Sequence, residues 1–226
     1  SSAGIEAGYN DQEYWKDRDP RFYQNVVYHG SKFGESYNDK LINFDIDPDV
    51  ADRTHGDWSD FKTSFMVRKF VNEELGASSA IVYTPVHPII RLADIYLMYA
   101  EALSEYNDGP TAEAIEYLNR VRSRSGMPAY DETNYAGGTP REKFHNAIKY
   151  ERKVEFFLEG NRYFDLRRWK EGADLNLTMV GAIINDGVVS RYKIGWEDIF
   201  EDKYYFHPFH NDWVSNTPGL YQNPGY

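Results

Sequence analysis

The sequence predicts a mainly α-helical fold: a tetratricopeptide-like helical hairpin plus further helices, with long loops and small β-strands. Two observations lead to this prediction. From residue 91 onward, apolar residues recur at the spacing of one helix face, and capping residues bound each such stretch. Residues 1–90 instead are rich in Asp, Asn, Gly and Tyr and keep no helical period for three turns. We therefore expect a loop-rich segment with short strands over 1–90 and a helical region with an irregular tail over 91–226, together forming one compact domain.

Two short strands are expected in the first segment, at residues 22–28 and 64–71, where apolar and aromatic residues cluster. Residues 17–21 (DRDPR) have the composition of a turn. Residues 31–56 form a long polar stretch, and loops of this length are usually functional or flexible.

The hairpin is predicted by two periodic stretches on either side of Asn107-Asp108-Gly109-Pro110. The first helix begins near Leu92, and its apolar face comprises Ile95, Tyr96, Tyr99, Ala100 and Leu103. The second has Thr111 as its cap and stops at Gly126, with one face made of Ala114, Ile115, Leu118, Val121 and Arg122. The pair resembles one degenerate tetratricopeptide repeat, which cannot bury both of its faces alone.

A third helix begins at a capping box, because Thr139 precedes Pro140 and stands three residues before Glu142. Its expected buried stripe comprises Phe144, Ala147, Ile148, Val154 and Leu158, and Gly160 is expected to end it. A short helix over 161–169 and a strand-like stretch at 204–206 complete the predicted elements.

Composition narrows the function classes. The formal net charge is −11, whereas nucleic-acid binders usually carry a basic patch, so we expect no nucleic-acid partner. The absence of cysteine excludes disulfides, thiol catalysis and zinc–thiolate sites. Aromatic residues make up 16% of the chain. Many of them have polar neighbours, which suits stacking on sugar rings, although Tyr also packs well in loop-rich domains.

Five segments resemble the SusD/RagB family of bacterial nutrient-binding proteins, and they occur in family order. Residues 91–103 (RLADIYLMYAEAL), 119–126 (NRVRSRSG) and 151–169 (ERKVEFFLEGNRYFDLRRW) match its helical motifs. Residues 19–21 (DPR) and the ending 222–226 (QNPGY) match its loop and terminal motifs. One departure is His207-Pro208-Phe209, where the family often has P-I-P.

The resemblance implies non-catalytic capture of an oligosaccharide, less often a peptide, at the bacterial outer-membrane surface without a cofactor. It also implies a SusC-type TonB-dependent transporter as partner, to which the ligand is handed. Family members are considerably longer and carry a lipid anchor, so we expect this chain to be a C-terminal domain or fragment. Two alternatives remain: a protein-interaction module whose ligand site lies in the missing N-terminal half, and a hydrolase that uses Glu151 and Glu155.

Three carboxylates, Glu151, Glu155 and Glu159, lie one helical turn apart. Glycosidases place their two carboxylates on opposite sides of the scissile bond, whereas residues of one helix face point the same way. Like charges at this spacing destabilise a helix unless nearby cations offset their repulsion. We therefore predict a structural ion network rather than a catalytic pair, with cations supplied by Arg152, Arg162, Arg167 and Arg168.

Two groups of possible metal ligands are weaker signals. No metal site is expected at His207, His210 and Asp212, because no third histidine is near them and they are not spaced along one face of a helix. A cluster of acidic residues comprises Asp45, Asp47, Asp49 and Asp52. It lacks the glycine and the terminal glutamate of an EF-hand loop, so we interpret these residues as solvated loop acids and not as a calcium site.

The remaining candidates for ligand binding are aromatic and polar residues of the long loop. We predict a site at Phe33, Tyr37, Asp57 and Trp58, where rings and hydrogen-bonding groups occur together. The competing interpretation is that Trp58 only anchors the loop to the core.

Overall fold

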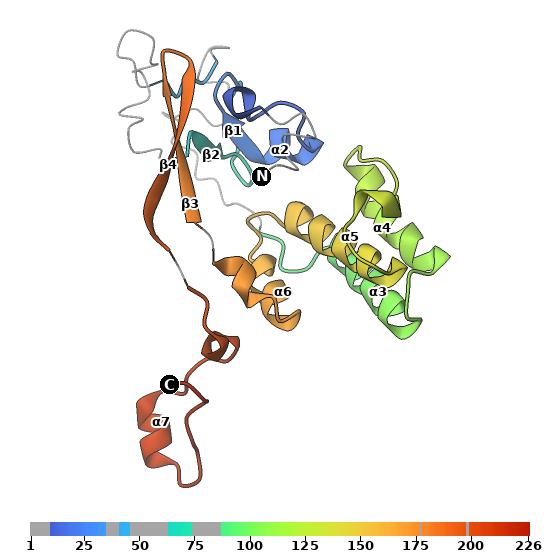
Figure 1. Cartoon of the computed structure of the whole chain (residues 1–226), viewed down its shortest axis with the longest axis vertical. Helices are drawn as coiled ribbons and strands as arrows, with labels where there is room; N and C mark the ends of the chain where they lie inside the picture. The colour runs from blue at the N-terminus through green and yellow to red at the C-terminus, as the bar shows by residue number, and fades with distance from the viewer. Residues whose placement is uncertain (1–9, 35–40, 46–62, 74–86, 177, 198) are drawn as a thin grey trace.

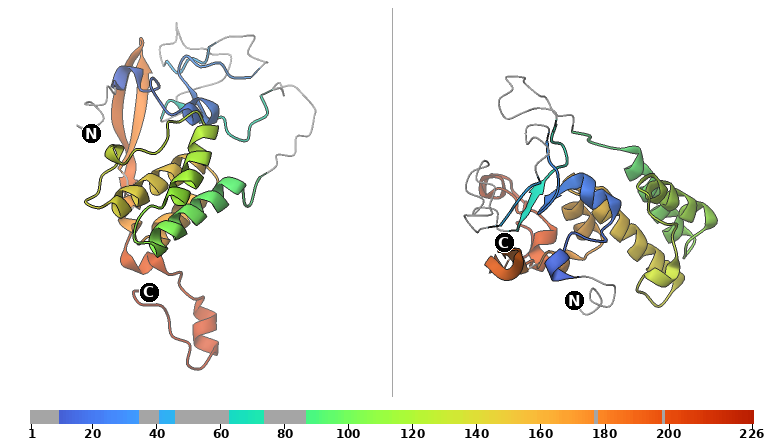
Figure 2. Two further views of the ribbon diagram at one scale, coloured as in Figure 1. Left: turned by 90° about the vertical axis from the view of Figure 1, so that its right-hand side faces the viewer. Right: turned by 90° about the horizontal axis from the view of Figure 1, so that it is seen from above.

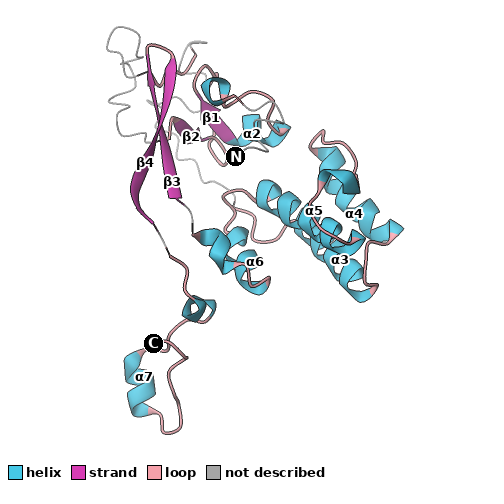
Figure 3. Cartoon of the chain, viewed as in Figure 1, coloured by secondary structure: helices cyan, strands magenta, loops and turns pink. Residues whose placement is uncertain are grey.

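The computed structural model describes residues 10–34, 41–45, 63–73, 87–176, 178–197 and 199–226. Within them, most of the helices form one body, two small antiparallel sheets and a short helix form a second, and the C-terminal tail extends away from both (Figure 1). Figure 3 shows that helix dominates over strand, which confirms the predicted mainly α-helical class. None of the helices in the described ranges is long and apolar enough to cross a bilayer.

The predicted hairpin is present as α3 (Leu92–Tyr106) and α4 (Ala112–Arg124), and α5 (Pro140–Glu155) packs against α3. Thr111 caps α4 as expected, because its hydroxyl accepts from the Ala114 N–H at 3.1 Å. The buried core of this body comprises Leu97, Ala100, Ala114, Leu118, Val121, Phe144, Ala147, Ile148 and Phe156. On α3, however, Ile95 and Tyr99 are 46% and 41% exposed. The prediction that they share the buried face is wrong, since α4 and α5 cover only the stripe that contains Leu97 and Ala100.

Helix α5 begins with the predicted capping box. The Thr139 hydroxyl accepts from the Glu142 N–H at 3.2 Å, and the Glu142 carboxylate accepts from the Thr139 N–H at 3.0 Å. Its end was predicted wrongly, because the helix stops at Glu155 and Gly160 is the N-cap position of α6 (Asn161–Arg168). Leu158, expected in the buried stripe, is exposed and has a φ of 61°.

Two cations from elsewhere in the chain bind carbonyls at the C-terminal end of α5. Arg91 donates to the carbonyl of Glu155 at 3.1 Å, and Lys69 donates to that of Phe157 at 2.7 Å. These side chains satisfy carbonyls at the end of the helix, which have no partner within it.

The second body begins with η1 (Asp11–Glu13), α2 (Pro20–Asn25) and β1 (Val26–Tyr28), and β1 pairs with β2 (Phe65–Val67). The strand predicted over 22–28 is therefore correct only for its last three residues. Asp19 and Pro20 start a helix instead, since the Asp19 carboxylate accepts from the Arg21 N–H at 2.9 Å. The strand predicted over 64–71 is confirmed in shorter form.

A hairpin of β3 (Thr178–Asn185) and β4 (Val188–Glu197) was not predicted, because the region after residue 169 was expected to be irregular. Asp186 and Gly187 form its two-residue turn, with φ of 48° and 71°. An Asp-Gly pair between strands is a strong hairpin signal. The buried core of this body comprises Tyr14, Val27, Ile42, Phe44, Ala182, Ile184 and Val189.

Asp45 is part of this second body. Its carboxylate accepts from the N–H groups of Asp186 at 3.1 Å and Gly187 at 2.7 Å. The interpretation of Asp45 as a solvated loop acid is therefore wrong: it is a buried residue that fixes the hairpin turn. Asp47, Asp49 and Asp52 lie outside the described residues.

Three short helical elements complete the described chain: η5 (Glu132–Asn134) follows α4, η6 (Gly172–Leu175) follows α6, and η7 (Asp202–Tyr205) follows β4. The strand predicted at 204–206 is wrong, because η7 occupies most of this stretch. The tail ends with α7 (Asn211–Asn216) and folds back on itself (Figure 2). Gln222 accepts from the Phe209 N–H and donates to the Phe209 carbonyl, both at 2.8 Å. Tyr226 donates to the carbonyl of Phe206 at 3.0 Å. The terminal motif thus closes the tail loop.

Candidate functional site

The carboxylates of Glu151, Glu155 and Glu159 form an ion network at the C-terminal end of α5. Glu151 is fully buried, and its two oxygens accept from Arg21 at 2.5 Å and Arg122 at 3.0 Å. Glu155 is buried as well, and it accepts from three guanidinium groups, those of Arg124 at 2.6 Å, Arg91 at 2.8 Å and Arg21 at 3.0 Å. Glu159 binds Lys69 at 2.6 Å and Arg91 at 2.8 Å. The predicted structural ion network is confirmed.

The cations of this network are not the predicted ones. Arg152 binds Asp94 and Asp165, each at 2.7 Å, and Arg168 binds Glu101 at 2.6 Å and Asp165 at 2.9 Å. Arg162 lies 3.8 Å from Asp174, and Arg167 contacts Tyr163, His207 and the Tyr205 carbonyl. Neighbours in sequence point to other faces of α5 and α6, so the partners of Glu151 and Glu155 come from other elements.

Burial and hydrogen bonding act in opposite directions on these carboxylates. Burial raises the pKa of Glu155, but hydrogen bonds from Arg91 and Arg21 outweigh it and lower the pKa below its ordinary value. For Glu159, burial is likewise outweighed by hydrogen bonds from Arg91 and Lys69, so its pKa is also lowered. A general acid in glycoside hydrolysis needs a raised pKa. Glu155 and Glu159 are therefore suited to holding arginines and not to donating a proton.

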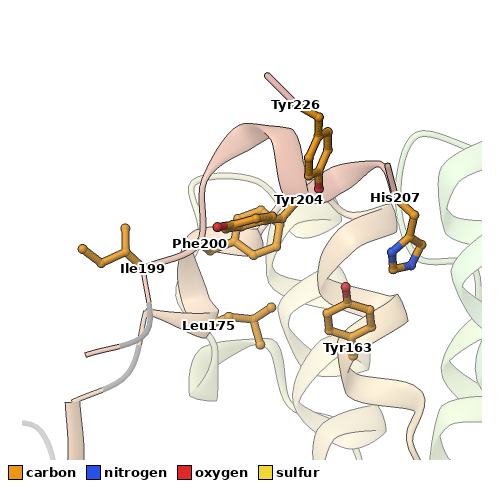
Figure 4. A pocket seen from close by; sticks show the side chains of 7 residues that line it. All are labelled: Tyr163, Leu175, Ile199, Phe200, Tyr204, His207 and Tyr226. Atoms are coloured by element: carbon orange, nitrogen blue, oxygen red, sulfur yellow. The ribbon is translucent and has the colours of Figure 1, made fainter. Parts of the chain in front are cut away.

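An aromatic pocket lies between α6 and the tail, with a volume of about 490 Å³ (Figure 4). We call it the tail pocket; its lining comprises Tyr163, Leu175, Ile199, Phe200, Tyr204, His207 and Tyr226. Figure 4 shows the Tyr163 hydroxyl directed toward the space between Tyr204 and His207. Five of these seven side chains are aromatic rings, four of them with a polar atom, which is the composition of many small-ligand sites.

Gly172 fixes one wall of the tail pocket. A Cβ at this residue would lie 2.1 Å from Cε1 of Phe200, so only glycine allows the phenyl ring to sit there. The Gly172 N–H also donates to the Tyr205 hydroxyl at 2.9 Å, and the rings of Phe200 and Tyr205 meet edge to face at 4.9 Å. These contacts bind the tail to η6.

Arg167 fixes the other wall, although sequence reasoning placed it among the partners of the α5 carboxylates. It donates to the Tyr163 hydroxyl at 2.7 Å, to the Tyr205 carbonyl and to Nε2 of His207, which lies 3.1 Å away. A guanidinium has only donors, so Nε2 accepts in this pair. One arginine thus joins α6 to two residues of the tail.

Of the predicted site residues, the structure describes only Phe33, which is not among the residues that line the tail pocket. Phe33 is half-buried and packs against the core of the second body. Tyr37, Asp57 and Trp58 lie outside the described residues. His207 lines the tail pocket, whereas the ring of His210 accepts from the Asp212 N–H at 3.3 Å at the start of α7. In the described ranges, no three residues of metal-binding type come together.

Sequence reasoning missed the tail pocket because its lining comes from three separate segments. The sequence contains a signal only in the number of tyrosines and in the aromatic cluster at 200–206.

Comparison with known proteins decides the family. A family model described as "SusD family" matches residues 1–226. The chain belongs to the SusD family. The SusD-like protein P2 of Formosa agariphila is 34% identical over 102 residues, which cover 44% of this chain and 19% of that protein.

Solved structures agree with this assignment. A SusD-like protein from Bacteroides fragilis is 28% identical with a TM-score of 0.73, over 94% of this chain and 40% of that one. A second protein from Bacteroides fragilis, described as a SusD-like carbohydrate-binding protein, is 24% identical with a TM-score of 0.62, over 87% of this chain and 40% of that one; at this identity the likeness shows the fold. The chain thus spans less than half of each of these relatives.

Proposed function

We propose that this SusD-family protein binds a nutrient glycan without catalysis at the bacterial outer-membrane surface and delivers it to a SusC-type TonB-dependent transporter. The observation that carries the proposal is the family match over residues 1–226. One structural relative, a SusD-like carbohydrate-binding protein of Bacteroides fragilis, agrees with it. Binding of this kind is non-covalent and requires no cofactor.

The state of the α5 carboxylates supports the non-catalytic part of the proposal. Both oxygens of Glu151 and both of Glu155 are occupied by guanidinium groups. A hydrolytic pair needs one carboxyl group to reach the leaving oxygen and the other to reach the opposite face of the sugar. Neither Glu151 nor Glu155 can do this without breaking buried ion pairs.

Binding and turnover can be tested together. On a glycan array followed by titration calorimetry, we expect the protein to bind at least one neutral or acidic oligosaccharide. Chromatography of the incubated ligand should show no shorter products. Slow hydrolysis that disappears in Glu151→Gln, with an unchanged circular dichroism spectrum, would overturn the non-catalytic proposal.

The proposed loop site spans residues 33–61, with Phe33, Tyr37, Asp57 and Trp58 as its ligand-binding residues. Phe33 packs against the second core, which positions the start of this segment on a rigid support. Rings among Asp, Asn, Ser and Gly offer stacking faces and hydrogen bonds together.

We expect Trp58→Ala to weaken glycan binding about tenfold, because stacking on one ring is worth on the order of 1.4 kcal/mol. Trp213→Ala is the matched control, since Trp213 is exposed in α7, far from the loop in sequence. Calorimetric titration of both variants measures the effect. Equal affinity of Trp58→Ala and the parent would remove Trp58 from the site.

A second function, a protein-interaction module of the same complex, is favoured by one observation. Four large apolar side chains are exposed just before α3 and in its first turn: Ile89, Ile90, Leu92 and Ile95. Exposed apolar patches often mark protein interfaces. This alternative predicts no glycan affinity for the chain but measurable binding to a detergent-solubilised SusC-type transporter.

A further inference from the structure

The tail pocket has the chemistry of a site for a neutral, ring-shaped ligand. Among the described residues, its lining contains no Asp, Glu, Lys or Arg side chain. Two cations next to lining residues in the sequence or in contact with them are engaged: Arg167 as described above, and Lys203 with Glu201 at 2.9 Å. An anionic ligand would lose its water here without gaining an unengaged cation, which is costly. A volume of 490 Å³ lies within the range of roughly 300–1,000 Å³ that small-ligand pockets occupy.

Two tyrosine hydroxyls leave hydrogen-bonding capacity for a ligand. The Tyr163 oxygen accepts from Arg167, so its hydrogen can be donated, and within the described ranges no acceptor takes it. The Tyr226 hydroxyl donates to the Phe206 carbonyl and keeps its lone pairs for accepting. A sugar hydroxyl both donates and accepts, and it can use either group.

The pocket is held in shape before any ligand arrives. Phe200 is packed on Gly172, Arg167 joins Tyr163 to His207, and Asn223 donates to the His207 carbonyl at 2.6 Å. At the rim, Tyr163, Ile199 and Tyr226 remain partly exposed. A ligand therefore meets accessible ring faces on a preorganised frame, which lowers the entropy cost of binding.

We propose that the tail pocket binds a pyranose unit of a neutral glycan, stacked by its C–H face on a tyrosine ring. This site is distinct from the proposed loop site at residues 33–61. It rests on the proposed glycan-binding function and adds to it a second contact and a preference for uncharged sugars.

The test uses the whole chain and defined probes: maltohexaose, laminarihexaose, xylohexaose and mannohexaose as neutral ligands, and hexagalacturonate as an acidic one. Titration calorimetry of Tyr163→Ala should show about tenfold weaker binding of the neutral probe that the parent prefers. Tyr163→Phe keeps the ring, so its affinity for the same probe should fall only a fewfold. Tyr106→Ala is the matched control, because Tyr106 ends α3 and is 89% exposed.

Amide chemical shifts of the unaltered protein give a readout that does not depend on a variant's folding. Titration with the bound neutral hexasaccharide should shift resonances of residues 172–175 and 199–207, and hexagalacturonate should leave them unchanged. The tail-pocket proposal would be overturned, and the proposed function left intact, by one result. In it, the neutral hexasaccharide shifts amide resonances only of residues 31–62, and Tyr163→Ala binds it with the same affinity as the parent. A protein that binds no glycan on the array and none of the probes would overturn both.

Discussion

Replacement of Glu155 by alanine is expected to lower the free energy of unfolding by about 3–5 kcal/mol, because it removes a buried carboxylate that accepts from three guanidinium groups, among them the buried one of Arg21. Glu155 joins Arg21, Arg91 and Arg124, which come from three different parts of the chain. Such a loss is a large share of the roughly 5–15 kcal/mol that stabilises a typical domain. Thermal melting should shift downward by about 10 °C or more.

Glu116→Ala is the matched control. Glu116 forms an ion pair with Arg120 at 2.6 Å on the exposed side of α4, and exposed pairs contribute little to stability because solvent screens them. Denaturant unfolding of both variants, measured beside glycan affinity, distinguishes a structural role of Glu155 from a role in ligand binding. If Glu155→Ala unfolds at the same denaturant concentration as the parent while glycan affinity is lost, Glu155 is a binding residue and the structural assignment is wrong.

Mild acid is expected to destabilise the protein strongly, through carboxylates whose pKa is lowered in the folded state. Burial raises the pKa of Asp19, Glu101, Glu155 and Glu159, but hydrogen bonds from arginines and other donors outweigh it in each case. A lowered folded pKa adds stability that is present above the unfolded value, about 3.9 for Asp and 4.3 for Glu. This stability is lost as the pH falls through the folded pKa.

We therefore expect the melting temperature to stay nearly constant from pH 7 to about pH 5 and to fall by about 10 °C or more by pH 3.5. Calorimetry across this range measures the effect. Glu155→Gln is the informative comparison: it lacks one of the titrating groups, so it is less stable at pH 7 but loses less on acidification. Parallel curves for Glu155→Gln and the parent would show that Glu155 does not contribute to the acid response.

Local signals in the sequence determined the helical hairpin and the start of α5. Thr111, Thr139 and Glu142 act on backbone groups within one turn, and the apolar period of α4 spans one helix face, so neither depends on distant residues. The family motifs likewise follow from the order of residues alone. Even the ion network could be predicted, because three glutamates on one face flanked by apolar residues require cations.

Only the tertiary structure decided which cations these are and where the tail pocket lies. Arg21 is 130 residues from Glu151 in sequence, and their pairing depends on α2 lying against α5. Arg91 and Lys69, which bind carbonyls at the end of α5, come from other segments, and the pocket follows from Arg167 and Gly172 holding the tail against α6 and η6. Spacing along a chain determines contacts within a helix or a turn. Contacts between segments far apart in sequence depend instead on how whole elements pack, which a one-dimensional pattern does not encode.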